Sequence, residues 1–252
     1  MKRILLAVLS AALTLTAGMS TASAQDGVPQ FRPVEMWACT FNDRKDQDDM
    51  DNVYDMIREG SSDSPYAAWQ LNPYFVGTRI QQFDFLYLGA WASASDMGAG
   101  LASDLGSSDA DEAWEDAVTC GGMMFASLRI QEAPQTGGAG DGFILTVQDC
   151  KTGKGVSSAQ ALSAIRAYND YRVANGMTIP TFAWFPTAGD GDADFDFKLA
   201  HAYQDAQGWG NANQWLIDNM AYQTRSQLTD GIVDCDESRV YVGQTLMDNL
   251  NQ

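Results

Sequence analysis

The chain of 252 residues contains a single histidine, His201, which is the first candidate for chemistry. One imidazole can serve as a general acid or base near neutral pH, and one proximal histidine is enough to hold a haem iron. Sites that need two histidine ligands are excluded. The alternative is a histidine that only packs in the core or at its rim. No other residue pattern supports haem, so haem is disfavoured.

The residues around His201 indicate which side chains it accompanies. Successive side chains of a strand point to opposite faces, counting here from Phe195. One face would carry Phe197, Leu199, His201 and Tyr203. Asp205 or Asn213 could then orient the imidazole. If the protein is an enzyme, this pattern predicts that His201 is its acid or base.

Four aspartates alternate just before this strand: Asp190, Asp192, Asp194 and Asp196. A calcium loop of the EF-hand type needs a glycine at its sixth position and a bidentate acid at its twelfth. Counted from Asp190, those positions hold Phe195 and His201, so an EF-hand is excluded. An irregular calcium site at Asp190, Asp192 and Asp194 is one hypothesis. A solvated turn between two strands is the alternative.

Aromatic residues are numerous and could line an apolar pocket for a planar ligand. The candidates for ligand binding are Trp184, Phe197, Tyr203, Trp69 and Trp91. Packing between helices and sheet is the alternative role. It is favoured for Trp69 and Trp184, which occupy matching positions in an internal repeat.

The first 24 residues have the pattern of a secretory signal peptide. Lys2 and Arg3 precede an apolar run at 4–15, and Ala22-Ser23-Ala24 forms a small-residue cleavage site. The run is too short to span a bilayer as an anchor. All four cysteines follow it, so they would enter an oxidising compartment. We therefore expect a periplasmic or secreted protein that does not bind the membrane after cleavage.

Charge excludes several classes of partner. The chain has 15 Lys and Arg against 33 Asp and Glu, a formal net charge of −18. This sign repels phosphate backbones and anionic membranes, so nucleic-acid binding through a basic patch is excluded. No nucleophile elbow, P-loop, dinucleotide fingerprint or HExxH motif is present. A small-molecule ligand is the partner class that remains.

An internal repeat divides the chain. Matching features recur in the same order at offsets of 111 to 115 residues: Cys39 with Cys150, Phe83 with Phe195, Trp69 with Trp184, and Cys120 with Cys235. Residues 133–141 between the copies are rich in Gly and contain Pro134, as a linker would. The predicted domains are a signal peptide at 1–24 and repeats at 33–132 and 142–250.

Each repeat shows the same order of periodicities. In the first repeat a strand-like run at 34–40 precedes a helical pattern at 50–57, strand-like runs at 66–69 and 83–91, a second helical region and a closing apolar run at 123–130. In the second repeat the corresponding runs lie at 143–147, 162–173, 181–185, 195–203 and 239–245. Ser157 and Ser158 offer N-caps for the helix of the second copy. The order β-α-β-β-α-β is that of a ferredoxin-like unit.

This topology selects one of the three possible cysteine pairings. The first and fourth strands are antiparallel neighbours, so the end of one lies beside the start of the other. Cys39–Cys120 and Cys150–Cys235 are the predicted disulfides, one per repeat. Free buried cysteines do not suit an oxidising compartment, and a redox-active pair would need a spacing such as C-x-x-C, which is absent.

The two copies of the third strand, FDFLYLGAW at 83–91 and FDFKLAHAY at 195–203, resemble those of the dimeric α/β-barrel superfamily. The resemblance implies that the two sheets face each other and that a pocket lies between helices and sheet, lined by the third strand. The superfamily includes small monooxygenases, haem-handling enzymes and proteins without known activity, so the fold does not fix a function.

The sequence thus predicts an α+β protein of two tandem ferredoxin-like repeats that form a pseudo-dimeric α/β barrel, as a monomer or homodimer. The first hypothesis for function is binding of a small apolar or aromatic ligand. The second is an oxygenase-like or isomerase-like enzyme that uses His201, and the third is a structural or interaction protein without a site. No cofactor is expected, with calcium as the open possibility.

Overall fold

A computed structural model describes residues 30–60, 64–77, 82–104, 108–132, 142–189 and 193–250. The predicted signal peptide at 1–24 and the linker at 133–141 lie outside the described residues. Among the helices of the described part, none is long and apolar enough to cross a membrane.

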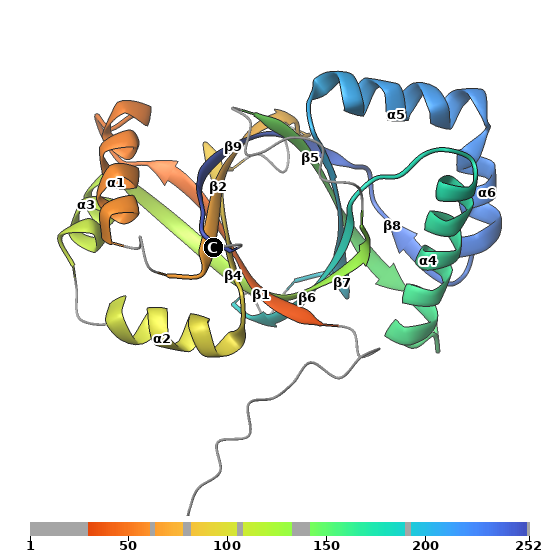
Figure 1. Cartoon of the computed structure of the whole chain (residues 1–252), viewed down its shortest axis with the longest axis horizontal. Coiled ribbons are helices and arrows are strands. Elements are labelled where there is room, and N and C mark those ends of the chain that lie inside the picture. Colours follow the sequence, from red (N-terminus) through yellow and green to blue (C-terminus); the bar gives the residue numbers. More distant parts are fainter. Residues whose placement is uncertain are drawn as a thin grey trace, which may run out of the picture.

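The first half of the chain contains four strands and three helices within the described residues (Figure 1): β1 (Phe31–Phe41), α1 (Gln47–Gly60), β2 (Tyr66–Phe75), β3 (Phe85–Trp91), α2 (Ala94–Asp104), α3 (Asp109–Ala117) and β4 (Val118–Gln131). The element order agrees with the predicted one. The second helical region consists of two helices, α2 and α3.

The second half repeats this order: β5 (Phe143–Thr152), α4 (Ser158–Ala174), β6 (Thr181–Ala188), β7 (Phe197–Tyr203), α5 (Ala206–Asp218), α6 (Ala221–Thr229), β8 (Val233–Cys235) and β9 (Arg239–Asp248). Its last strand is divided into β8 and β9. β8 pairs with the end of β5, and β9 pairs with the beginning of β5. Ser157 caps α4 through a reciprocal pair of bonds with Gln160, as expected from its position before the helix.

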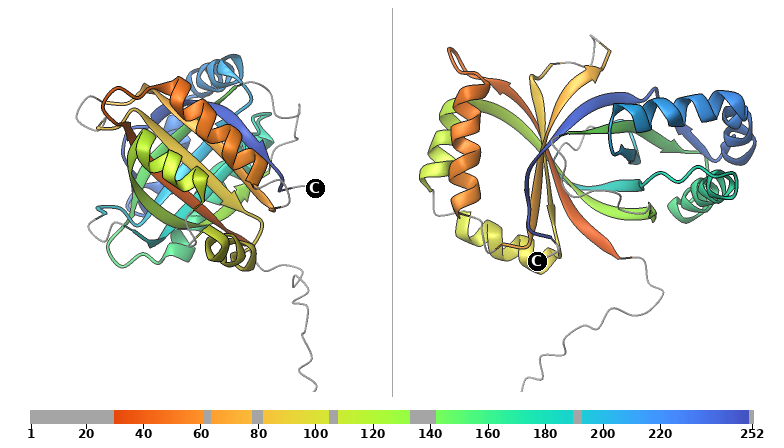
Figure 2. Two further views of the ribbon diagram at one scale, coloured as in Figure 1. Left: turned by 90° about the vertical axis from the view of Figure 1, so that its left-hand side faces the viewer. Right: turned by 45° about the horizontal axis from the view of Figure 1, so that its top comes forward.

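The strands close into an antiparallel β-barrel, seen down its axis in Figure 1. Hydrogen-bonded neighbours follow the order β7-β6-β4-β1-β3-β2-β9-β5, and β5 pairs with β7 to complete the ring. The two halves meet at two seams, β4 with β6 and β2 with β9. Helices α1 to α3 cover one side of the barrel and α4 to α6 the opposite side (Figure 2).

Alternation along the strands separates three apolar clusters. The barrel interior is filled by one cluster to which all eight barrel strands contribute, including Leu88, Phe125, Val147 and Tyr241. The opposite faces of the strands pack against helices, α1 and α3 in the first half and α4 in the second. Each face of the sheet therefore buries apolar surface, and β3 is buried along its whole length.

Both predicted disulfides are confirmed. Cys39 is bonded to Cys120 and Cys150 to Cys235, with Cα–Cα distances of 4.1 and 4.0 Å. Each pair stands directly opposite in a strand ladder, β1 with β4 and β5 with β8. The adjacency of first and last strands that selected these pairings from the sequence is therefore observed in both halves.

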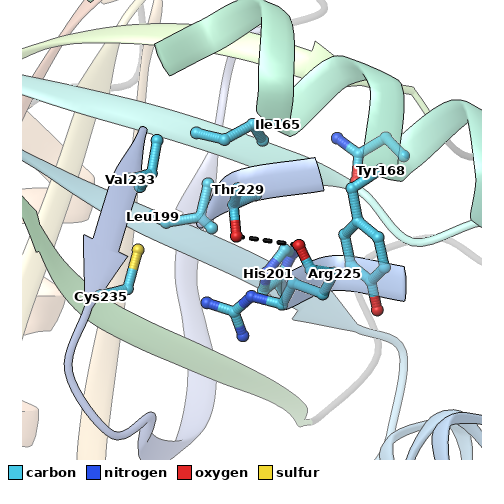
Figure 3. Close-up of a pocket in the computed structure, with 9 residues that line it drawn as sticks. Ile165, Tyr168, Leu199, His201, Arg225, Thr229, Val233 and Cys235 are labelled. Carbon is cyan, nitrogen blue, oxygen red and sulfur yellow. Dashed lines mark hydrogen bonds between the residues drawn. The ribbon is translucent and has the colours of Figure 1, made fainter. Parts of the chain in front are cut away.

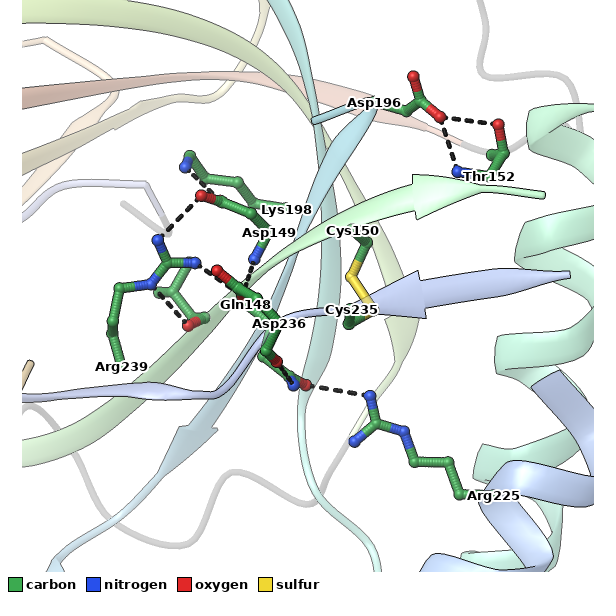
Figure 4. Close-up of a disulfide and its surroundings, with 11 residues drawn as sticks. Gln148, Asp149, Cys150, Thr152, Asp196, Lys198, Arg225, Cys235, Asp236 and Arg239 are labelled. Carbon is green, nitrogen blue, oxygen red and sulfur yellow. Dashed lines mark hydrogen bonds and ion pairs between the residues drawn. A yellow bond between two sulfur atoms is a disulfide. The ribbon is translucent and has the colours of Figure 1, made fainter. Parts of the chain in front are cut away.

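One end of the barrel in the second half carries a partly buried ion cluster (Figure 4). Asp149 accepts from Lys198 Nζ at 2.5 Å and from Arg239 Nη1 at 2.9 Å, and Arg239 Nη2 reaches Asp236 at 3.1 Å. Burial raises the pKa of Asp149, but Lys198 and Arg239 outweigh it and hold this pKa below its ordinary value. The corresponding positions of the first half are apolar: Ala38, Leu86 and Met123.

Candidate functional site

His201 lies on β7 and faces the helices of the second half. Phe197 and Leu199 on the same strand belong to the cluster beneath α4, whereas Ala200 belongs to the barrel interior. The predicted alternation is therefore observed. The imidazole is half-buried, and Tyr203 is the next residue on its face.

A cavity of about 30 Å³ lies beside His201, between β7 and the two helices α4 and α6 (Figure 3). Its polar lining comes from His201, Asn169, Arg225 and Thr229, and Ile165 and Leu199 supply apolar walls. One water needs roughly 10–15 Å³ of such space. The cavity therefore has room for about two waters or one ligand of a few non-hydrogen atoms.

Arg172 on α4 organises the polar groups behind the cavity. Its Nη2 donates to Thr181 Oγ1 at 3.0 Å and also to Asn169 Oδ1. Since the amide oxygen of Asn169 is occupied by Arg172, its Nδ2 is left to face elsewhere. Asn169 is only 2% exposed, and this Nδ2 has no hydrogen-bond partner among the described residues. A buried amide donor without a partner is unfavourable unless a ligand or water accepts from it.

The hydrogen bonds of Thr181 fix the imidazole. Thr181 Oγ1 donates to the carbonyl of Ile179 at 3.0 Å and lies 3.0 Å from His201 Nδ1. A hydroxyl has one proton, so Nδ1–H donates to Thr181 and Nε2 keeps its lone pair. Thr181 thus orients the imidazole, the role that the sequence suggested for Asp205 or Asn213. Asp205 instead caps α5, and Asn213 donates to the carbonyl of Trp209.

The site is electropositive in a strongly acidic chain. Arg172 is 4% exposed and Arg225 is half-buried, and within the described part of the chain neither has a carboxylate partner. Arg172 lies over the ring of Tyr168, 5.3 Å from its centroid, and Arg225 contacts Gln148 Oε1 at 3.3 Å. Burial, Arg172 and Arg225 lower the pKa of His201 well below its ordinary value, so the imidazole is neutral at pH 7.

The matching place in the first half is filled by a side chain. Gly89 on β3 corresponds to His201, since Glu35 lies opposite Gly89 as Thr146 lies opposite His201. A Cβ at Gly89 would lie 2.0 Å from the hydroxyl of Tyr66, the first residue of β2. Thr181, the first residue of β6, is the smaller counterpart of Tyr66. The exchange of tyrosine and glycine for threonine and histidine leaves room for the cavity in the second half.

The five aromatic residues proposed as ligand contacts are distributed over the molecule. Trp184 and Trp69 pack in the cluster of the barrel interior, and Trp91 packs beneath the helices of the first half. Phe197 and Tyr203 share the strand face of His201. None of the five lines the cavity beside His201, and their role as ligand contacts stays a prediction.

Residues that the sequence did not single out build most of the site. Asn169 and Arg172 lie on the buried side of α4 together with Ala161, Ile165 and Tyr168. Val173, which the apolar pattern placed on that side, is 41% exposed. A polar residue at a buried helical position is a usable signal, but the helix must first be placed in its correct rotation.

The calcium hypothesis rests on Asp190 and Asp192, which lie outside the described residues, and on Asp194. Asp194 forms an ion pair of 2.6 Å with Lys151, and Asp196 accepts from the backbone and hydroxyl of Thr152. Among the described residues, no group of three or more His, Cys, Asp or Glu side chains could hold a metal. Calcium binding stays a prediction.

Haem, which the superfamily resemblance brings into consideration, does not fit this site. Cofactor-sized ligands need pockets of about 300–1,000 Å³, and the space beside His201 measures about 30 Å³. Arg172 and Arg225 also add positive charge beside the ring.

No protein-family model matches the sequence, and no curated protein sequence matches it either. Solved structures do match. A "putative monooxygenase" from Fusobacterium nucleatum has a TM-score of 0.55 at 8% identity, covering 86% of this chain and 93% of that chain. A "putative monooxygenase" from Lactobacillus acidophilus has a TM-score of 0.51 at 9% identity, covering 86% and 95%.

A chlorite dismutase variant from Candidatus Nitrospira defluvii has a TM-score of 0.52 at 10% identity, covering 87% of this chain and 94% of that one. The fold is that of the dimeric α/β-barrel proteins. In this dimeric α/β barrel, one chain supplies all eight strands of the ring. At such identities the likeness concerns the fold alone.

Proposed function

We propose that this protein is exported to the periplasm or secreted, and that its barrel is a pseudo-dimer of two ferredoxin-like repeats at 33–132 and 142–250. The signal-like segment at 1–24 and the two disulfides support export. The same strand order in both halves supports the repeat: β4-β1-β3-β2 in the first and β9-β5-β7-β6 in the second.

We further propose that the protein binds a small polar ligand in the cavity beside His201. The unpartnered Nδ2 of buried Asn169 is the observation that carries this proposal, because such a donor calls for an acceptor inside the cavity. The volume favours a ligand of a few atoms over the planar aromatic molecule that the sequence suggested. Phe197 and Tyr203 then support the site from the strand.

Enzyme activity is the second candidate. His201 is neutral at pH 7, and its Nε2 has no hydrogen-bond partner in the described part of the chain. A neutral imidazole held by a second residue can take a proton from a bound molecule. In this function His201 would act as the base, and Thr181 would orient it.

Ligand binding is tested by thermal denaturation with four small probes, nitrate, formate, urea and methylammonium. Affinity cannot exceed about 1.5 kcal/mol per non-hydrogen atom, so a four-atom ligand binds no more tightly than tens of micromolar. At ~100 times its dissociation constant, a ligand that binds only the folded state stabilises it by about 2.7 kcal/mol. We expect at least one probe to raise the melting temperature by several degrees.

The matched control is Thr181→Tyr with His201→Gly, which reproduces the filled arrangement of Tyr66 and Gly89 and leaves the charge at pH 7 unchanged. General salt effects act on both proteins, and binding acts only on the wild type. Equal shifts in the two proteins for every probe would refute the proposed site.

A further inference from the structure

We propose that the ligand of this cavity is a small oxyanion, and that it binds together with a proton on His201 Nε2. This inference rests on the proposed binding function and names the chemical class of its ligand. It follows from three features of the described residues: an unbalanced charge, a set of donors and the orientation of the imidazole.

The charge of the site lacks a counterion. Arg172 is almost completely buried, yet among the described residues it bonds only the neutral partners Asn169 and Thr181. Arg225 bonds the neutral Gln148. Buried charges in proteins are normally paired, and Lys198 and Arg239, the other buried cations among the described residues, do meet carboxylates. An anion in the cavity would balance the two arginines.

The cavity offers donors. Asn169 Nδ2 has no partner, and the bond from Arg172 to Oδ1 prevents the amide from turning its oxygen inward. Arg225 also lines the cavity. Thr229 donates its proton to the carbonyl of Arg225, one turn back along α6. A ligand with several acceptor oxygens satisfies the donors of Asn169 and Arg225, whereas a cation or a pure donor does not.

The imidazole completes the site only when it is protonated. Because Nδ1–H is directed to Thr181, the free ring can present only a lone pair to an anion at Nε2. Addition of a proton turns Nε2 into a donor. The groups that face His201 are Tyr168 and Arg172 on α4, Arg225 on α6 and Tyr203 on β7. Burial raises the pKa values of Tyr168 and Tyr203 above their ordinary values, so the imidazole, rather than either phenol, is the group that accepts the proton.

The test uses the full exported protein, tag-free, with nitrate as the probe, because nitrate stays an anion throughout this pH range. Nitrate affinity is measured by calorimetry from pH 5 to 8, and the protonation midpoint of the sole histidine is followed by NMR with and without nitrate. Proton uptake on binding predicts at least a tenfold loss of affinity across the range. By linkage, saturating nitrate should raise the histidine midpoint by at least one pH unit.

Two variants isolate the roles of proton and charge. His201→Gln places a permanent donor near Nε2, so it should bind nitrate with an affinity independent of pH. Asn169→Asp supplies the missing carboxylate and should weaken nitrate binding at least tenfold. Asn211→Asp, which adds the same charge on the exposed side of α5, should leave binding unchanged.

The outcomes separate this inference from the proposed function. Binding of urea without nitrate would leave a polar-ligand site and overturn the oxyanion. Nitrate affinity that is independent of pH in the wild type, with an unmoved histidine midpoint, would overturn the coupled proton. If none of the four probes binds, both proposals fail.

Discussion

Arg172 does not line the cavity, yet it determines the chemistry there. It orients the amide of Asn169, holds the hydroxyl that positions His201 and contributes to the field that lowers the pKa of the imidazole. A guanidinium is suited to this because its donors are fixed in one plane. One buried side chain thereby couples helix α4 to strand β7.

The depressed pKa of His201 predicts an acid-sensitive fold. The unfolded chain takes up a proton near pH 6.5, and the folded chain does so only at lower pH, so stability falls as the pH drops below 6.5. The loss should be about 1.4 kcal/mol per pH unit down to the folded pKa. Urea denaturation at pH 7.5 to 5 measures it. His201→Gln should lack this component, and identical pH profiles for the two proteins would contradict it.

At the scale of elements, β3 and β7 show how one position can be filled or left open. The space that a side chain at Gly89 on β3 would fill is occupied by Tyr66. The Tyr66 hydroxyl is hydrogen-bonded to Tyr87 at 2.9 Å and also to Glu35. His201 on β7 meets the smaller side chain of Thr181 at the corresponding place. The strand scaffold is the same, so the difference between a packed and an open helix–sheet contact depends on two residues per half.

We predict that Gly89→Ala destabilises the protein by about 1–3 kcal/mol, because the new methyl group would overlap the Tyr66 hydroxyl at 2.0 Å. Gly121→Ala on β4 is the matched control, since nothing lies within 4 Å of its Cβ position. Chemical denaturation of both variants checks the prediction. If the two substitutions have equal effects, steric overlap is not the reason for Gly89.

The ion cluster on β5, β7 and β9 gives a second prediction at this scale. Asp149→Ala leaves Lys198 and Arg239 without their shared carboxylate and should cost about 3–5 kcal/mol. Replacing all three by the first-half residues, as Asp149→Ala, Lys198→Leu and Arg239→Met, should recover most of that loss. The stabilities of the single and triple variants are compared by their denaturant midpoints at pH 7. A triple variant that is no more stable than Asp149→Ala would contradict the prediction.

Element order and disulfide pairing could be predicted from the sequence because each depends on local periodicity and on the adjacency of first and fourth strands. The site could not. The contact of His201 with Thr181 depends on the β6–β7 register, and Asn169 and Arg172 face inward through a rotation of α4 that the apolar pattern, with Val173 included, misplaced. The division of the helical regions and of the last strand also left no periodic signal.

For the whole molecule, the covalent links and the hydrogen-bonded seams have separate roles. Each disulfide joins two strands of the same half, while the halves are joined by the strand ladders of β4 with β6 and β2 with β9 and by the shared apolar cluster of the barrel interior. Loss of one disulfide should therefore remove a link within one half and leave the contacts between the halves in place.

Replacing both Cys150 and Cys235 by alanine should lower the free energy of unfolding by about 2–5 kcal/mol. Replacing Cys39 and Cys120 should have a similar effect, because the two disulfides close loops of similar length, with separations of 85 and 81 residues. The quadruple variant should show the sum of the two losses. Thermal or urea denaturation measures it. A quadruple loss far from additive would show that the disulfides are coupled across the seams.

The β2–β9 seam has a consequence for how the chain folds. It joins residues 67–75 to residues 240–248, so the ring can close only after the last strand has been made. Until then β2 is an open edge that ends in exposed Tyr74 and Phe75, an arrangement prone to association between incomplete chains. The net charge of −18 provides mutual repulsion during that interval, and so protects the nascent barrel before closure removes the edge.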